Sequence, residues 1–408
     1  MGYFKDTIKG ISWMGALRGT TRAIAFIKIG FLARILSPFE FGLFGIASLV
    51  LAFLEILTET GINAFLVQEE SDIKEYINSA WIVSLVRGFL IAFLILILAI
   101  PVSTFFNSPE SIRLLFLIST VPFLRGFINP AVVNFQKKLQ FNKEFNFRLT
   151  IFTFDAIVTI FLAILLKSAE SLVWGMIAGS LLEIILSWLL VRPLPRFNIE
   201  SVKVKKVFQR GKWITLAGIF DYLFHNIDDA LVGRLINTTS LGLYQIAYKI
   251  STLPITEGGE VVSKVVFPVY TRIYGDRERL RTAYFKVLGS ITLVTIPFGL
   301  FLIIFAEPFV LLFLGSKWLE IIPALKVLSV FGVVRAISGS TSALFLAIKK
   351  QEYITLVTFV SIAGLSMTAL PLISRFGMLG AAYASLIGAF VSIPVMFHFA
   401  RKVLYEKG

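Results

Sequence analysis

Residues 13–47 read WMGALRGTTRAIAFIKIGFLARILSPFEFGLFGIA, and a related stretch returns without a gap at residues 213–247, WITLAGIFDYLFHNIDDALVGRLINTTSLGLYQIA. Several positions are identical in the two stretches, and similar residues fill many of the others. The identical pairs include Trp13 and Trp213, Arg34 and Arg234, Gly42 and Gly242, Leu43 and Leu243, Ile46 and Ile246, and Ala47 and Ala247. This spacing predicts that the chain is two copies of one unit.

The composition places the two copies in a membrane. Of the 408 residues, 57% are hydrophobic and 16% are charged, and the mean hydropathy is +0.83. Such a chain has too little polar surface for a soluble fold. Apolar stretches of about twenty residues, each long enough to cross the hydrocarbon as a helix, recur along its length. We predict spans at 9–36, 41–65, 78–103, 112–135, 147–167, 171–192, 212–236, 241–271, 283–306, 322–348, 352–374 and 378–401.

The predicted fold is an all-α polytopic membrane protein of about twelve helices, arranged as two parallel six-helix repeats around a central cavity. Residues 1–192 form the first six-helix lobe and 212–408 the second. Between them, 193–211 form a basic cytoplasmic linker. Because cytoplasmic connections are rich in Lys and Arg, we expect both termini in the cytoplasm of a cell membrane. The residues that set this orientation are Lys137, Lys138, Lys143, Arg272, Arg277, Arg279, Arg281, Lys349, Lys350, Arg401 and Lys402.

Several classes of function are disfavoured. The chain has no cysteine and only two histidines, so the sequence offers no metal cluster, and no cofactor motif is recognisable. The formal charge of +14 reports orientation in a membrane protein, so we expect no nucleic-acid partner. No nucleophile with a base, and no phosphate-binding glycine loop, has a recognisable spacing. We therefore expect a protein that is not an enzyme, and a monomer.

The first predicted hairpin carries four charges inside its spans. Folding it about 38–39 places Arg18 level with Glu59 and Arg22 level with Glu55. One interpretation is a ladder of structural ion pairs, since buried charges usually find partners. The other is a basic cavity wall in which Arg18 and Arg22 hold an anionic head group through bidentate hydrogen bonds. Arg125 and Arg335 are further candidates for this head-group site, and Arg87 and Arg148 also lie in or near spans.

The second copy carries acids where the first copy carries bases. Asp221, His225, Asp228 and Asp229 follow one face of the seventh span. Folding the second hairpin brings Asp228 level with Lys249, which predicts a structural ion pair. The other interpretation is a coupling site, in which Asp221, His225, Asp228 and Asp229 are candidates to bind a proton or a sodium ion that drives a transport cycle.

Small residues mark positions where helices are expected to pack closely. Gly15 and Gly19 form a G-x-x-x-G step, as do Gly175 and Gly179.

The second half of the chain resembles the polysaccharide exporters of the multidrug/oligosaccharidyl-lipid/polysaccharide superfamily. Residues 226–249, NIDDALVGRLINTTSLGLYQIAYK, carry the resemblance together with several shorter motifs. In the first half, 34–38 and 40–44 are similar to the family. The shorter motifs are Leu253-Pro254, Phe267-Pro268, Arg279-Leu280, Leu314-Gly315-Ser316-Lys317-Trp318 and 377–382.

The resemblance implies a flippase that moves an oligosaccharide or polysaccharide precursor, carried on a polyprenyl pyrophosphate, to the outer leaflet by alternating access. It also implies coupling to H⁺ or Na⁺ and a basic cavity that meets the pyrophosphate, besides ordinary contacts with membrane lipids. Two alternatives stay open. One is a multidrug exporter of organic cations with the same architecture. The other is a membrane glycan polymerase or ligase, which we expect to need a large external loop where this sequence predicts short ones.

Overall fold

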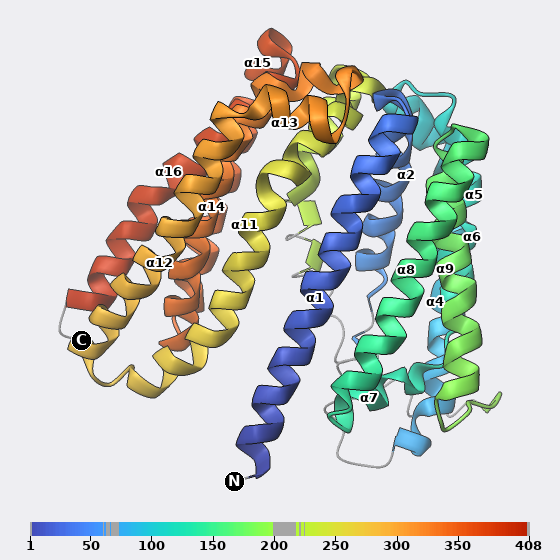
Figure 1. Cartoon of the computed structure of the whole chain (residues 1–408), viewed down its shortest axis with the longest axis horizontal. Coiled ribbons are helices and arrows are strands. Elements are labelled where there is room, and N and C mark those ends of the chain that lie inside the picture. The colour runs from blue at the N-terminus through green and yellow to red at the C-terminus, as the bar shows by residue number, and fades with distance from the viewer. Residues whose placement is uncertain are drawn as a thin grey trace. The chain divides into compact units, whose positions relative to one another are not determined.

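The computed structural model describes residues 2–59, 61, 62, 66, 73–198, 218, 219, 222, 223 and 225–405. Within these ranges the chain forms helices and no strand, which confirms the predicted fold class (Figure 1). The helices gather into two compact units. We call them the first unit, Met1–Ile227, and the second unit, Asp228–Gly408.

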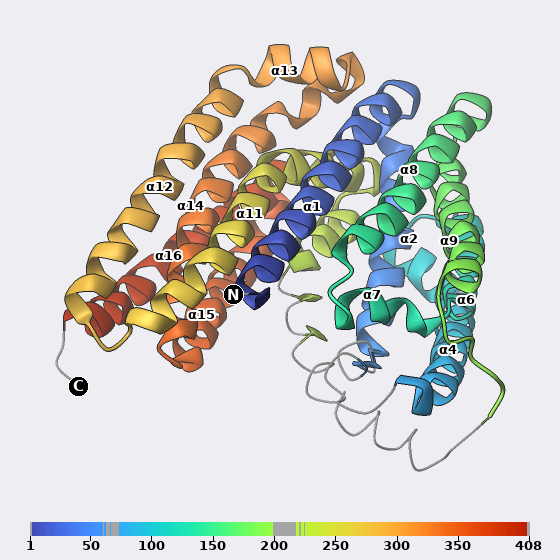
Figure 2. The same ribbon diagram turned by 60° about the horizontal axis from the view of Figure 1, so that its bottom comes forward.

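Long helices make up most of the first unit, and the ends of two of them match the predicted spans to within three residues. The elements are α1 (Gly2–Ile35), α2 (Pro38–Leu57), η1 (Ile73–Glu75), α4 (Ile77–Phe106), α5 (Ser111–Ile118), α6 (Thr120–Arg125), η2 (Pro130–Val133), α7 (Asn134–Lys137), α8 (Phe141–Leu166) and α9 (Glu170–Leu190). Helix α1 lies along α8, and α8 lies along α9, in both views (Figures 1 and 2).

Local sequence signals explain where these helices begin. Ser37 caps α2, because its hydroxyl oxygen accepts a hydrogen bond from the Glu40 N–H at 3.3 Å, and Pro38 occupies the first helical position. The G-x-x-x-G step of α9 allows close contact with α8: a Cβ on Gly175 would lie 1.8 Å from the Thr159 hydroxyl oxygen. In the other step, no described atom lies within 4 Å of the position that a Cβ on Gly19 would occupy.

The fourth predicted span, 112–135, is wrong as a single straight helix. The segment Ser111–Arg125 is followed by a break, and Pro130–Lys137 then leaves at an angle of 69°. Proline disfavours helical geometry in the residue before it, and Asn129 is extended with φ −67° and ψ 113°. The Asn129 side chain caps the next turn by accepting a hydrogen bond from the Ala131 N–H at 3.0 Å.

The second unit is built around α14 (Ile322–Ala347), which contacts α11 (Thr238–Ile273), α12 (Arg277–Ile304) and α16 (Met378–Tyr405). Helix α15 (Gln351–Phe376) packs on α16, and α13 (Ala306–Phe313) and η3 (Ser316–Ile321) join α12 to α14 (Figure 2). Residues 228–235, at the start of this unit, are also helical. The predicted spans at 241–271, 322–348, 352–374 and 378–401 therefore correspond closely to α11, α14, α15 and α16.

Eight helices among the described residues are long and apolar enough to cross a membrane, or nine if the bent segment counts as one span. The protein is therefore a multi-pass membrane protein, although the predicted number of twelve is not reached by this criterion. Of the predicted linker 193–211, only residues 193–198 are described. The start of the predicted span at 212–236 also lies outside the described residues.

Candidate functional site

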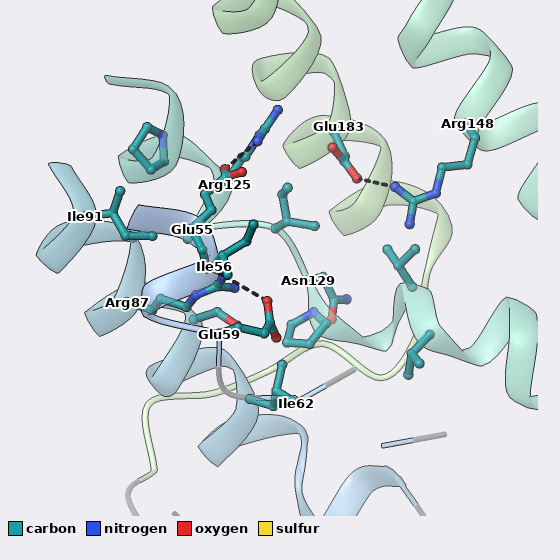
Figure 3. Close-up of a pocket in the computed structure, with 18 of the residues that line it drawn as sticks. Glu55, Ile56, Glu59, Ile62, Arg87, Ile91, Arg125, Asn129, Arg148 and Glu183 are labelled. Atoms are coloured by element: carbon teal, nitrogen blue, oxygen red, sulfur yellow. Dashed lines mark hydrogen bonds and ion pairs between the residues drawn. The ribbon is translucent and has the colours of Figure 1, made fainter. Parts of the chain in front are cut away.

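A cavity of about 580 Å³ lies within the first unit, and we call it the charged cavity (Figure 3). Its walls come from α2, α4, α6, α8, α9 and the bend between α6 and η2. Apolar and small residues such as Ile91 and Gly88 share these walls with seven charged side chains. The charged residues are Glu55, Glu59, Arg87, Arg125, Glu144, Arg148 and Glu183.

Two glycines bring Arg87 and Arg125 to the same cavity. A Cβ on Gly88 would lie 2.5 Å from the carbonyl oxygen of Pro122, 3.1 Å from the Gly126 Cα and 3.2 Å from its nitrogen. Helices α4 and α6 can approach this closely only because both positions lack a side chain. Since each arginine directly precedes one of these glycines, the contact brings the main chain of Arg87 close to that of Arg125.

Glutamates at the end of α2 hold these two arginines. The Arg87 Nη2 donates to the Glu59 Oε2 at 3.0 Å and to the Glu55 carbonyl oxygen at 2.6 Å, and its Nε donates to the Thr58 hydroxyl at 3.2 Å. The Arg125 Nη1 donates to the Glu55 Oε1 at 2.6 Å (Figure 3). In the structure, the glutamates thus pair with arginines of α4 and α6. The sequence-based hairpin predicts instead that Glu55 lies level with Arg22.

The opposite wall carries a third arginine and two more carboxylates. The Arg148 Nη1 donates to the Glu183 Oε1 at 3.3 Å (Figure 3). Glu144, one turn before Arg148 in α8, is only 3% exposed. Its Oε1 accepts a hydrogen bond from the Gln136 amide at 2.7 Å, and its Oε2 has no hydrogen-bond partner among the described residues. A buried carboxylate oxygen without a donor is unfavourable.

The basic cavity wall predicted around Arg18 and Arg22 stays a prediction, and the charged cavity itself is mixed in charge. Its lining contains four glutamates and three arginines. Glu144 and Glu183 were not singled out from the sequence, although a charge inside an apolar span was an available signal. Arg125 is the one predicted head-group residue that lines this cavity.

The other predicted head-group residues lie elsewhere. Arg18 and Arg22 are on α1, where Arg18 is half-buried and Arg22 is exposed. Arg335 lies on α14 in the second unit, where its Nη1 donates to the Tyr248 hydroxyl at 2.5 Å and its guanidinium lies over the Phe331 ring.

The acidic face predicted in the second copy forms a hydrogen-bonded cluster in the second unit. Asp228 is 4% exposed. Its Oδ2 accepts hydrogen bonds from the Tyr244 hydroxyl at 2.6 Å and the Ser385 hydroxyl at 3.2 Å. The neighbouring Asp229 accepts one from the Gln245 amide at 3.1 Å.

The ion pair predicted between Asp228 and Lys249 stays a prediction. Lys249 is five residues after Tyr244, about 140° around α11, so its Cα lies on a different side of the helix from that of Tyr244. Lys249 is exposed and interacts electrostatically with Asp229. His225 is half-buried and lies three residues before Asp228 in the helical segment that precedes α11. Asp221 lies outside the described residues.

Another charge of the first copy has a partner that the sequence did not suggest. The Lys28 ammonium of α1 donates to the Asp155 Oδ1 of α8, and the Thr159 hydroxyl donates to the same oxygen at 3.1 Å. This arrangement neutralises both charges within the first unit. The second copy differs here. The repeat places Asp228 at the position that corresponds to Lys28, and Asp228 belongs to the acidic cluster of the second unit.

Comparison with known proteins gives consistent matches over most of the chain. The family model described as polysaccharide biosynthesis protein matches residues 31–323. An uncharacterized membrane protein in the cps region of Klebsiella pneumoniae is 27% identical, over 97% of this chain and 82% of its own length. The lipopolysaccharide biosynthesis protein WzxC of Escherichia coli is 25% identical, over 85% of this chain and 71% of its own.

Solved structures share the fold at lower sequence identity. The lipid II flippase MurJ, in an inward closed conformation, matches with a TM-score of 0.73 and 18% identity, over 95% of this chain and 89% of its own. An inward-facing multidrug resistance transporter of the MATE family matches with a TM-score of 0.66 and 16% identity, over 94% of both chains.

Proposed function

Because the chain belongs to the family of polysaccharide biosynthesis proteins, we propose that it is a flippase for a polyprenyl-pyrophosphate-linked oligosaccharide or polysaccharide precursor. In this proposal it moves the precursor from the cytoplasmic to the outer leaflet of the cell membrane and acts as a transporter, not as an enzyme. The observation that carries the proposal is the charged cavity, which places three arginines inside a lobe of apolar spans.

The depth of these arginines supports a functional role. Arg87 is ten residues from the start of α4, about 15 Å along the helix, and Arg148 is seven residues from the start of α8, about 10 Å along it. A charge this far into a span is unfavourable unless it is paired or faces water, and such residues usually serve a substrate or ion path. Here both conditions hold, because the arginines are paired and line a cavity.

Pyrophosphate is the ligand that suits Arg87 and Arg125. Guanidinium groups bind phosphate oxygens through two parallel hydrogen bonds, and these charge-assisted bonds are about twice as strong as neutral ones. The pyrophosphate would replace Glu59 and Glu55 as the acceptor of the arginine N–H groups. The released carboxylates could then accept hydrogen bonds from sugar hydroxyls. Arg18, Arg22 and Arg335 remain proposed contributors to head-group binding.

The cluster around Asp228 is our proposed coupling site. Its carboxylate is buried in the second unit and is surrounded by hydroxyl groups that can reorient when a proton or a sodium ion binds. An ion that binds one conformation more tightly than another shifts the transport cycle by that difference in affinity. Asp229, His225 and Asp221 stay candidates for the same role, and we propose that both termini face the cytoplasm.

A multidrug exporter is the second candidate, because the charged cavity has one more carboxylate than guanidinium groups. Glu144, with its unpartnered oxygen, could attract an organic cation. The two functions predict opposite effects at Arg125: its loss should weaken transport of an anionic lipid head group but favour a cation.

The test is export of surface glycan by a strain that depends on this protein, measured together with the lipid-linked precursor that accumulates inside. Arg125→Gln should reduce export about tenfold or more, since a hydrogen bond to a charged group contributes about 1.5–3 kcal/mol. The paired variant Glu55→Gln/Arg125→Gln should also be defective although it leaves no unpaired charge. Arg113→Gln is the matched control, because Arg113 is exposed and pairs with Glu170 away from the cavity. Normal export by both Arg125 variants, at equal protein abundance, would refute the head-group role.

A further inference from the structure

A second hollow of the first unit lies where two spans end, outside the charged cavity. We call it the basic hollow, of about 640 Å³, and Lys74, Arg192 and Arg196 provide its charged lining. Lys74 lies three residues before the start of α4, and Arg192 lies two residues after the end of α9. Among the described residues, no acid contributes to its lining, although Glu75 is exposed next to Lys74.

Buried asparagines hold the segment that carries the two arginines. The Asn129 amide donates to the Pro193 carbonyl oxygen at 3.1 Å, and the Asn134 amide donates to the Arg192 carbonyl oxygen at 2.9 Å. The Arg196 N–H donates in turn to the Asn78 side-chain oxygen at 2.8 Å. Asn129 is fully buried. Exposed segments after a helix are usually mobile, so these bonds fix Arg192 and Arg196 in place.

The guanidinium groups keep hydrogen-bonding capacity for a ligand. The Arg192 Nη1 donates to the carbonyl oxygens of Trp188 at 2.8 Å and Val191 at 3.0 Å. Its Nε and Nη2 have no hydrogen-bond partner in the part of the chain that the structure describes. Within the same part, Arg192 and Arg196 form no ion pair with a carboxylate. The two arginines therefore present positive charge that no carboxylate of the described residues neutralises through an ion pair.

The residues around the basic hollow fit the boundary between lipid head groups and acyl chains. Trp188 lines the hollow and packs edge-on against Trp81, which also contacts Phe197. Tryptophan concentrates at this boundary in membrane proteins. Leu189, Leu190 and Phe197 are 67%, 64% and 78% exposed, respectively, and offer an apolar surface beside the charged lining.

We propose that the basic hollow binds the phosphate head group of an anionic phospholipid, whose acyl chains lie along Leu189, Leu190 and Phe197. Basic pockets at the ends of transmembrane helices recognise such head groups through charge and hydrogen bonds. The phosphate oxygens accept from Arg192 and Arg196, while Lys74 contributes charge. This site is separate from the transport cavity, so the inference goes beyond the proposed function and does not depend on it.

The experiment titrates the purified full-length protein in detergent with phosphatidylglycerol and counts bound lipids by native mass spectrometry. The double variant Arg192→Gln/Arg196→Gln should bind phosphatidylglycerol about 25-fold more weakly, or about fivefold for each basic residue, which corresponds to about 1 kcal/mol each. Arg113→Gln/Arg375→Gln removes the same charge from exposed residues elsewhere and should change the affinity less than twofold. Arg192→Lys/Arg196→Lys keeps the charge and should retain most of the binding.

Three further measurements decide the outcome. Phosphatidylcholine should bind weakly to every variant. Inorganic phosphate at about 10 mM should leave phosphatidylglycerol bound to the wild type, because the acyl chains contribute to the affinity of the lipid. The thermal midpoint without added lipid should be similar in all variants. An equal loss in the Arg113/Arg375 control, or unchanged binding by Arg192→Gln/Arg196→Gln, would overturn the proposal. Full displacement by inorganic phosphate would also overturn it, since the site would then be one for free anions.

Discussion

The contact between α4 and α6 predicts that Gly88→Ala damages the charged cavity without touching any charged residue. The new Cβ would meet the Pro122 carbonyl oxygen at 2.5 Å, whereas ordinary van der Waals contact begins at 3.4 Å. The obstacle is main chain, which no side-chain rotation can move, so the two helices must separate by about 0.9 Å. Overpacking of this kind costs about 1–3 kcal/mol.

A loss of about 2 kcal/mol should lower the thermal midpoint of a unit of this size by roughly 4–8 °C. Glycan export should fall as well, because the separation pulls Arg125 away from Glu55 and from its position beside Arg87. Thermal unfolding of the purified protein followed by tryptophan fluorescence gives the first readout, and the surface-glycan assay gives the second.

Gly15→Ala is the matched control for this prediction. No described atom lies within 4 Å of the position of its Cβ, and alanine favours helix over glycine by about 1 kcal/mol. This variant should keep or raise the midpoint and keep export. A wild-type midpoint and normal export for Gly88→Ala would show that the close approach of α4 and α6 does not position the arginines.

Three other variants test individual side chains by thermal unfolding or transport. Asp155→Asn should lower the midpoint by the equivalent of about 2 kcal/mol because it leaves Lys28 unpaired, and Lys28→Met/Asp155→Asn should recover part of that loss; no recovery would argue against the pair. Asp228→Asn keeps an acceptor for its hydroxyl neighbours but removes the charge, so transport should lose its dependence on the sodium or proton gradient, and an unaltered dependence would leave Asp228 a structural residue. Glu144→Gln should change the free energy of unfolding by less than about 1 kcal/mol, since one carboxylate oxygen lacks a donor among the described residues; a larger decrease would indicate a partner for that oxygen.

Helix positions were predictable because their signals are local. Ser37-Pro38 marks the start of α2, and the apolar stretches at 322–348 and 352–374 give α14 and α15 nearly to the residue. The bend after Arg125 also had a local signal, Asn129-Pro130, which carries the cap and the restricted residue before proline. The prediction of one straight span overlooked this signal, because the apolar stretch 112–135 is long enough to cross a membrane as a single helix.

Ion-pair partners could not be predicted in the same way. The hairpin argument compared residues on consecutive helices, but Glu55 pairs with Arg125, which is seventy positions away, and Lys28 pairs with Asp155, 127 positions away. Such pairs depend on which helices pack together and on their rotation about their axes. A single sequence does not contain that information, even where it correctly indicates that a charge inside a span needs a partner.

The mixed charge of the charged cavity follows from the need to fold before a substrate is present. An arginine alone in an apolar lobe would be strongly unfavourable, so Glu55 and Glu59 stabilise Arg125 and Arg87 in the empty protein. In the proposed function, the same carboxylates compete with a pyrophosphate for the guanidinium groups, which would limit its affinity and allow its release. Both pairs keep partial exposure, between 24% and 41% of each side chain, so water can enter and the exchange of acceptors requires no dry, fully buried charge. A carrier must bind and release its load in each cycle, and exchangeable ion pairs satisfy both requirements better than unpaired arginines.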